Sequence, residues 1–221
     1  MPVLNDAPAL AAQAAFFALL RDRGHESVVV DGGSSDDSLA VAEAIADRVI
    51  QAPRGRAVQM NAGARAASRN LLWFVHADSV VGVAQLRALE ALQGEAFWGR
   101  FDVRLDASGA LYRVIGNMMN LRSRVTGIAT GDQAVFVTAA LFRETGGYPP
   151  IPLMEDIALS RQLRRRSRPQ CLPQQLLASA RYWQRHGVLR SILTMWGLRL
   201  AYCLGADPAW LHRVYYGRPP A

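Results

Sequence analysis

The segment Val28–Asp36 constrains the fold of this chain more than any other stretch of similar length. Three consecutive valines predict a short buried strand over Ser27–Asp31, because β-branched side chains pack well in a sheet covered on both faces. The glycine pair Gly32-Gly33 then allows a sharp turn, and a helix is expected over about Asp37–Ala46. A strand, a tight turn and a helix in this order indicate an α/β sheet whose ligands bind just beyond the carboxyl ends of its strands.

The same alternation continues to about residue 95 and indicates a parallel, doubly wound sheet. The predicted elements are a helix from Pro8 to Leu20 or Arg23, a strand over Arg48–Ala52, a helix over Ala57–Ser68 and a strand over Leu71–His76.

Beyond residue 95 the pattern changes. Phe97–Leu105 alternates apolar and polar residues, as an edge or antiparallel strand does, so the whole sheet is expected to be mixed and mostly parallel. Gln170–Leu177 is ambiguous. The other predicted elements are a strand over Gln133–Val137 and helices over Leu111–Arg124, Ala139–Thr145, Glu155–Arg166 and Val188–Leu204.

Length and composition favour a single globular domain over residues 1–221, because 51% of the 221 residues are hydrophobic and no repeat or linker divides them. Cys171 and Cys203 have no metal-ligand spacing, so reduced thiols in a cytoplasmic protein are expected. No signal-peptide pattern is found at the start, and no apolar stretch is long enough to span a bilayer.

Positive charge is concentrated in the last third of the chain. Residues 157–221 hold 11 arginines and one acid, and lysine is absent throughout. The absence of lysine excludes a P-loop lysine and a Schiff-base lysine. The arginines could face phosphate groups of a ligand, nucleic acid or an anionic membrane, and a solvated basic face is equally compatible.

Acidic residues fall where such a sheet places its ligand. Asp31 and Asp78 each follow a predicted strand, and Glu155-Asp156 opens a predicted helix. Carboxylates suit a Mg²⁺ or Mn²⁺ ion that bridges the phosphates of a diphosphate ligand. Asp156 lies at a helix start, where the helix dipole favours its ionised form, so it could accept a proton. Alternatively, Glu155 and Asp156 only complement the dipole.

Six motifs in order resemble the family 2 glycosyltransferases of the GT-A fold, and most closely small bacterial members with His-Ala-Asp in place of Asp-x-Asp. The resemblance implies a nucleotide-binding half (1–95), an acceptor and catalytic half (96–187) and C-terminal helices (188–221). The motifs are Pro2–Asp6, Val30–Asp36, Arg54–Gly63, Phe74–Ser79, Gly131–Gln133 and Met154–Asp156.

The resemblance implies transfer of a sugar from a nucleotide-diphosphate donor to a hydroxyl acceptor with inversion. Asp156 is then the general base, with Glu155 beside it, and Asp78 holds the divalent ion with His76 as a candidate second ligand. The implied nucleotide-sugar-binding residues are Pro2, Leu4, Asn5, Asp6, Asp31, Gly32, Gly33, Arg54, Arg56, His76, Ala77, Asp78, Gly131, Asp132, Gln133 and Arg185.

Two features depart from the family pattern. His76 replaces the first acid of the usual Asp-x-Asp motif, so metal binding rests mainly on Asp78. The chain also starts inside the expected first strand, which indicates either a late start assignment or a truncated strand.

The C-terminal region offers several interpretations. Arg181–Gly187 lies where similar enzymes carry an Arg/Trp-rich segment, in which Trp183 is either a sugar-stacking face or part of the core. Val188–Leu204 is apolar nearly all round, which suits a buried helix, a homodimer face or an interfacial membrane helix. Related acceptors are often lipid-linked, so peripheral attachment to the inner face of the plasma membrane is a further hypothesis.

Two other classes of protein remain compatible with these residues. A nucleotidyltransferase could use a similar sheet, but it would normally carry a glycine-rich loop near its first strand, and Val3–Pro8 has no glycine. A non-catalytic basic module on a degenerate transferase scaffold would bind an anionic membrane or nucleic acid. Nucleic acid is the less expected partner, because the positive charge forms no recognisable recognition motif.

Overall fold

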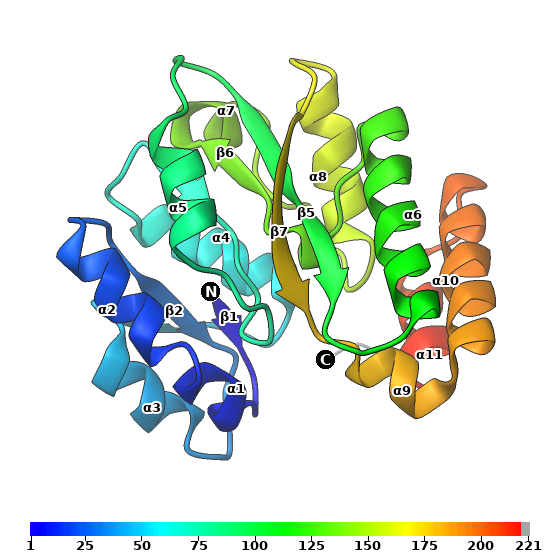
Figure 1. Cartoon of the computed structure of the whole chain (residues 1–221), viewed down its shortest axis with the longest axis horizontal. Coiled ribbons are helices and arrows are strands. Elements are labelled where there is room, and N and C mark those ends of the chain that lie inside the picture. Colours follow the sequence, from blue (N-terminus) through cyan, green and yellow to red (C-terminus); the bar gives the residue numbers. More distant parts are fainter. Residues whose placement is uncertain (218–221) are drawn as a thin grey trace.

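The computed structural model describes residues 1–217, so the last four residues of the expected C-terminal helical segment lie outside the described range. Helices and strands alternate along most of the chain (Figure 1). The strands are β1 (Pro2–Val3), β2 (Val28–Asp31), β3 (Arg48–Gln51), β4 (Leu71–Trp73), β5 (Trp98–Leu105), β6 (Phe136–Thr138) and β7 (Gln170–Ala178). The helices are α1 (Ala7–Ala11), α2 (Ala14–Asp22), α3 (Ser38–Ile45), α4 (Arg56–Ala66), α5 (Val83–Glu90), α6 (Ala110–Thr126), α7 (Ala139–Glu144), α8 (Glu155–Arg164), α9 (Arg181–His186), α10 (Val188–Cys203) and α11 (Pro208–Tyr216), with a 3₁₀ turn at Gly131–Gln133.

The strands form two hydrogen-bonded sheets. β1, β2 and β3 are parallel neighbours, with Pro2 opposite Val30 and Val28 opposite Arg48. The second sheet has the order β4-β6-β5-β7, in which β5 and β7 are parallel but β6 is antiparallel to both of its neighbours. The mostly parallel mixed sheet is therefore confirmed. The parallel pairing expected up to residue 95 holds for β1, β2 and β3 but is wrong for β4, which pairs antiparallel with β6.

Most predicted elements are present, with three differences. The helix expected from Pro8 to Arg23 is divided into α1 and α2, and between them the buried side chain of Gln13 donates hydrogen bonds to the carbonyls of Ala77 (3.1 Å) and Ser79 (2.7 Å). The ambiguous segment Gln170–Leu177 is strand β7. The predicted strand over Leu71–His76 is shortened to β4. The strand predicted over Gln133–Val137 begins later, as β6, because Gln133 belongs to the 3₁₀ turn and Ala134 is left-handed (φ 46°).

The core lies between the second sheet and the helices around it. Its central side chains include Phe101, Phe136 and Leu176, all fully buried. Trp183 of α9 belongs to the same cluster, which confirms the core interpretation of this residue rather than a sugar-stacking face. Figure 1 shows α1–α3 gathered beside the first sheet and α6, α8 and α10 on the opposite side of the molecule.

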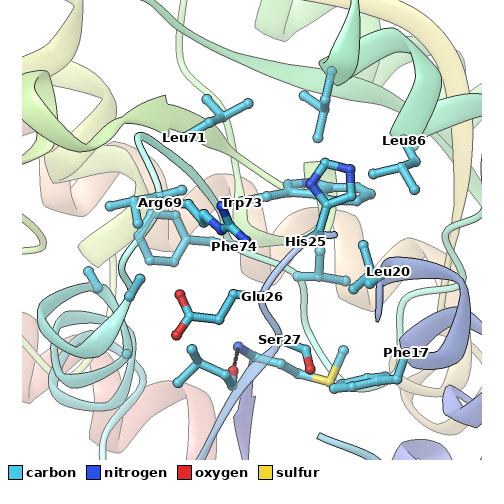
Figure 2. Close-up of a pocket in the computed structure, with 18 of the residues that line it drawn as sticks. Phe17, Leu20, His25, Glu26, Ser27, Arg69, Leu71, Trp73, Phe74 and Leu86 are labelled. Carbon is cyan, nitrogen blue, oxygen red and sulfur yellow. Dashed lines mark hydrogen bonds between the residues drawn. The ribbon is translucent and has the colours of Figure 1, made fainter. Parts of the chain in front are cut away.

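A mostly apolar pocket of about 390 Å³, the interstrand pocket, is lined by residues of both sheets. It is bounded by β2 and β4 and by residues of α2, α4 and α5, and Figure 2 shows Phe17, Trp73 and Leu86 around it. β1 pairs with β2 only through Pro2 and Val3, and the Met1 ammonium donates to the Val28 carbonyl at 2.8 Å. Burial lowers the pKa of this ammonium from 8.0 to about 5.

Two whole-chain expectations can be compared with the structure. Cys171 and Cys203 are both free thiols. Within residues 1–217, no helix combines the length and hydropathy needed to cross a bilayer.

Candidate active site

A second pocket, the polar pocket, lies at the carboxyl ends of β1 and β4 and has a volume of about 580 Å³. Eight of the predicted binding residues line it, and they come from three separate motifs: Pro2, Leu4, Asp6, Arg54, Arg56, His76, Ala77 and Asp78. Its remaining wall is formed by Gly55 and Ala57–Gln59 of the same loop and helix, by the turn at Pro150–Pro152 and by Ala209, His212 and Tyr216 of α11. Helix α11 thus lines the same pocket as Pro2, although the two are more than two hundred positions apart in the sequence.

Gln59 of α4 fixes the floor of this pocket. Its amide donates to the carbonyls of Val3 and Val30, both at 2.9 Å, and so ties β1 to β2. A Cβ atom on Gly32 would lie 3.0 Å from the Gln59 side chain, so the turn after β2 requires a small residue at that position. The close approach of Gln59 therefore explains why the motif has glycine at position 32.

Asp31 and Asn5 hold the loops around the floor. Asp31 is 1% exposed, and its carboxylate accepts hydrogen bonds from the backbone N–H groups of Gly33 (2.9 Å) and Ser34 (3.0 Å). The side-chain carbonyl of Asn5 accepts from the N–H of Ser35 at 2.7 Å. Both side chains therefore stabilise turns. Neither lines the polar pocket, so the direct nucleotide contacts expected of Asp31 and Asn5 stay predictions.

A buried ion pair joins the two halves of the chain. Arg56 Nε lies 2.8 Å from Glu155 Oε1, and the Glu155 side chain is 3% exposed against 40% for Arg56. Burial raises the pKa of Glu155 to about 7, although Arg56 opposes this shift. Burial alone would lower the pKa of Arg56, but the nearby carboxylates of Glu155, Asp156 and Asp132 raise it overall. Arg56 is thus a cation surrounded by acids.

Asp156 lies in the first turn of α8, which follows Met154 in the left-handed conformation (φ 70°). Its carboxylate accepts hydrogen bonds from the N–H of Gly131 (3.0 Å) and from the N–H of Ile157 (2.7 Å). The side chain is half-buried, so it is both oriented by the backbone and accessible. A carboxylate held in this way can accept a proton from a group brought against it.

His76 packs directly against Gly131, whose N–H donates to the Asp156 carboxylate. A Cβ atom on Gly131 would lie 2.3 Å from His76 Cε1, so only glycine fits there. Burial and the neighbouring Arg56 lower the pKa of His76, against the opposing effects of Asp132, Asp78 and Asp156. The imidazole is therefore neutral at neutral pH, which is the form that can bind a metal. The motifs around His76, Gly131 and Asp156 meet in one place.

Asp78 and His76 form a small donor set for a divalent cation. Asp78 is 37% exposed at the pocket wall, and its Oδ2 lies 3.4 Å from Arg181 Nη2. Within residues 1–217, no cluster of three or more His, Cys, Asp or Glu side chains could enclose a metal ion. A Mg²⁺ or Mn²⁺ ion commonly takes one or two protein ligands and completes its shell with water and substrate phosphates, so these residues fit such an ion.

Three of the predicted site residues lie elsewhere or act differently. Arg185 is exposed on α9 and does not line the polar pocket. Gln133 is fully buried, and its side-chain oxygen accepts from the N–H of Thr130 at 3.2 Å, so it shapes the 3₁₀ turn. Asp132 is the central residue of that turn and is exposed. Sugar contacts by these three residues stay predictions.

Three further residues reach the site and were not predicted. Arg181 at the start of α9 lies 3.0 Å from Asp6 and 3.4 Å from Asp78. Tyr216 of α11 lines the polar pocket beside Arg56. Arg122 of α6 is mostly buried near Asp156, and two of its guanidinium nitrogens have no hydrogen-bond partner. The basic, aromatic composition of the last third signals Arg181 and Tyr216 in the sequence, whereas nothing there signals Arg122.

Comparison with known families agrees with this geometry. The family model "Glycosyl transferase family 2" matches residues 1–143. The chain belongs to glycosyl transferase family 2. Two uncharacterized glycosyltransferases of Mycobacterium tuberculosis, from strains CDC 1551 / Oshkosh and ATCC 25618 / H37Rv, are each 37% identical to it over 143 residues, which cover 58% of this chain and 53% of theirs. This family 2 chain therefore spans about half the length of those relatives.

Solved structures establish the GT-A fold of this family 2 chain. The mannosyltransferase PcManGT of Pyrobaculum calidifontis, in complex with GDP-Man and Mn²⁺, has a TM-score of 0.59 at 19% identity, over 80% of this chain and 54% of that one. Glucosyl-3-phosphoglycerate synthase of M. tuberculosis, in complex with Mn²⁺, UDP and glucosyl-3-phosphoglycerate, has a TM-score of 0.57 at 17% identity, over 80% and 68% of the two chains. At these identities the likeness is one of fold.

Proposed function

We propose that this chain transfers a sugar from a nucleotide-diphosphate donor to a hydroxyl acceptor in the polar pocket. One observation carries the proposal: His76 beside the cation ligand Asp78 packs on Gly131, whose N–H holds the Asp156 carboxylate. The cation-binding group lines the polar pocket, and the proton acceptor lies behind it, on the other side of Gly131 and outside the lining itself. The family and the Mn²⁺-containing structural neighbours support this reading.

The nucleotide enters along the wall formed by the first, third and fourth motifs. Pro2 and Leu4 offer apolar contacts for a base, and Arg54 offers an exposed guanidinium for phosphate oxygens. Asp78, with His76 beside it, would hold the divalent ion, which when bound offsets the negative charge that develops on the leaving diphosphate. The donor base and sugar are left open by these residues.

The proton from the acceptor hydroxyl goes to Asp156. As the acceptor oxygen attacks the anomeric carbon, the bond from that carbon to the diphosphate breaks on the opposite face and the configuration inverts. The N–H groups of Gly131 and Ile157 keep the carboxylate aimed. Arg56, held by the buried Glu155, adds positive charge near the leaving group.

A thermal-shift screen tests this proposal. UDP-, GDP-, ADP-, CDP- and dTDP-sugars are added with and without Mn²⁺, and one nucleotide is expected to raise the melting temperature by several degrees in a Mn²⁺-dependent way. Asp78→Asn should abolish the Mn²⁺-dependent part, whereas the control Asp22→Asn, an exposed acid of α2, should leave it unchanged. If no nucleotide stabilises the protein while DNA or anionic vesicles bind in a salt-sensitive way, the non-catalytic basic module replaces this proposal.

A further inference from the structure

Two helices far apart in the sequence present apolar stripes to solvent. On α10, Leu189, Leu193, Trp196, Leu200 and Leu204 are 61–80% exposed. The spacing of these residues places them on one face of the helix. On α6 the same pattern is formed by Leu111, Val114, Met118, Leu121 and Val125, which are 51–78% exposed.

The opposite faces of both helices pack on the same core. Ile115 of α6 belongs to the cluster around Phe101, and Ile192 and Met195 of α10 pack against it. Both helices lie on the right-hand side of the molecule in Figure 1. Both helices are therefore packed on the core with one face, and each presents a second apolar face to solvent. Exposed apolar residues gathered in this way mark an interaction surface.

Helix α11 extends this surface and joins it to the polar pocket. Trp210 and Val214 are 46% and 50% exposed, and α11 contacts α10. On its other side, the same helix lines the pocket with Ala209 and Tyr216. We call the exposed apolar residues of α6, α10 and α11 the apolar face. A surface that covered the apolar face would lie next to the pocket wall.

The charge of these helices indicates what covers the apolar face. Helices α6, α10 and α11 contain no aspartate or glutamate. Arg113, Arg190 and Arg213 are exposed on these helices and Arg199 is half-buried, whereas Arg122 is mostly buried near Asp156 and Arg124 pairs with Asp102. Tryptophan and leucine on one side of a helix with arginines around them suit an interface between water and anionic lipid.

We propose that the apolar face docks the protein on an anionic lipid surface, so that the acceptor is a hydroxyl group carried by a membrane lipid. Docking by α10 and α11 places the mouth of the pocket at the headgroup level, where such a hydroxyl lies. The choice of acceptor rests on the proposed transferase function, whereas docking does not.

Vesicle co-sedimentation tests docking without turnover. Vesicles of phosphatidylglycerol and phosphatidylcholine (1:1) are expected to bind the protein, and vesicles of phosphatidylcholine alone to bind it at least about fivefold more weakly. The double variant Leu193→Ser/Leu200→Ser should lower binding to the anionic vesicles at least about tenfold. Both residues are more than 60% exposed, so the core is not disturbed. The matched control is Val80→Ser/Val83→Ser, which removes exposed apolar side chains near β4 and α5 and should leave binding unchanged.

The remaining outcomes separate docking from function. Absence of vesicle binding at low ionic strength overturns the proposal. So does a dimer in analytical ultracentrifugation that Leu193→Ser/Leu200→Ser dissociates, because a second copy then covers the apolar face.

Once the donor is known, radiolabelled sugar should pass into the lipid extract of vesicles that contain lipids with free hydroxyls. Vesicle binding with a Mn²⁺-dependent donor shift but no labelled lipid overturns the acceptor assignment alone, and vesicle binding without any donor shift overturns the transferase function while docking stands.

Discussion

The two pockets of this chain differ in the surroundings of their charged groups. At the interstrand pocket, His25 Nε2 lies 2.9 Å from Glu90 Oε1, and both side chains are partly exposed. At the polar pocket, Arg56 of the wall lies 2.8 Å from Glu155, whose side chain is 3% exposed. The hydrogen bond with His25 lowers the pKa of Glu90, whereas burial raises the pKa of Glu155 to about 7.

This difference shows why shape alone does not locate a site. The interstrand pocket is lined by β2, β4 and three helices, and its walls are mostly apolar, with charged residues such as Glu26 and Arg69 among them. The polar pocket is lined by side chains from the two ends of the chain, and Asp78, His76 and Arg56 converge there. An acid, a histidine and an arginine from separate motifs that meet at one pocket are typical of functional sites.

The largest expected effect is on the transfer rate, and it comes from Asp156, the proposed proton acceptor. Asp156→Asn keeps the oxygen that accepts from Gly131 but cannot take a proton, so the transfer rate should fall about 10³-fold. Calorimetric affinity for the nucleoside diphosphate should stay within about twofold of the parent protein, because the donor side is untouched. Asp22→Asn is the matched control. Near-normal turnover of Asp156→Asn would remove this residue as the base.

The second effect is a pH dependence at the polar pocket. Arg56→Gln leaves Glu155 buried without its counter-ion, and since Arg56 is partly exposed we expect a loss of about 1 kcal/mol at pH 8. Glu155 has a pKa of about 7 beside Arg56, and without that cation its pKa rises further, so the loss should grow above pH 7 and be absent at pH 5, where Glu155 is protonated in both proteins. Arg56→Gln/Glu155→Gln should restore stability at pH 8. A loss that is the same at pH 5 and pH 8 would contradict the buried ion pair.

The smallest expected effect distinguishes the two pockets through substitutions on α4, which lines both of them. Ala64 of α4 lines the interstrand pocket and Val58 of the same helix lines the polar pocket. Ala64→Met should fill apolar space and raise the free energy of unfolding by up to about 1 kcal/mol with donor affinity unchanged. Val58→Met should instead weaken donor affinity without added stability. If Ala64→Met weakened nucleotide binding, the interstrand pocket would have to be part of the site.

Local patterns in the sequence predicted the first half of the fold well. The valine run, the glycine turn and the Arg48–Gln51 strand appear in parallel register as β2 and β3. The direction of β6 could not be predicted, because the alternation of side chains along a strand does not depend on the direction of its neighbours. The break between α1 and α2 was also hidden, since it depends on contacts of Gln13 with residues more than sixty positions away.

The candidate site was predictable as motifs but not as contacts. Asp78 and His76 lie at the pocket as expected from their motif. The Arg56–Glu155 pair joins residues about a hundred positions apart, so only the tertiary structure shows that one motif neutralises another. In the Arg/Trp-rich segment, Arg181 and not Arg185 reaches Asp78, because the helix begins at Arg181 and turns Arg185 toward solvent.

The most direct test of the polar pocket as the donor site is a crystal structure with Mn²⁺ and the nucleoside diphosphate that gives the largest thermal shift. The anomalous signal of manganese should lie beside the Asp78 carboxylate, with Arg181 displaced toward the phosphates and the base near Pro2 and Leu4. Manganese or nucleotide bound in the interstrand pocket, or at any place away from Asp78, would contradict the account.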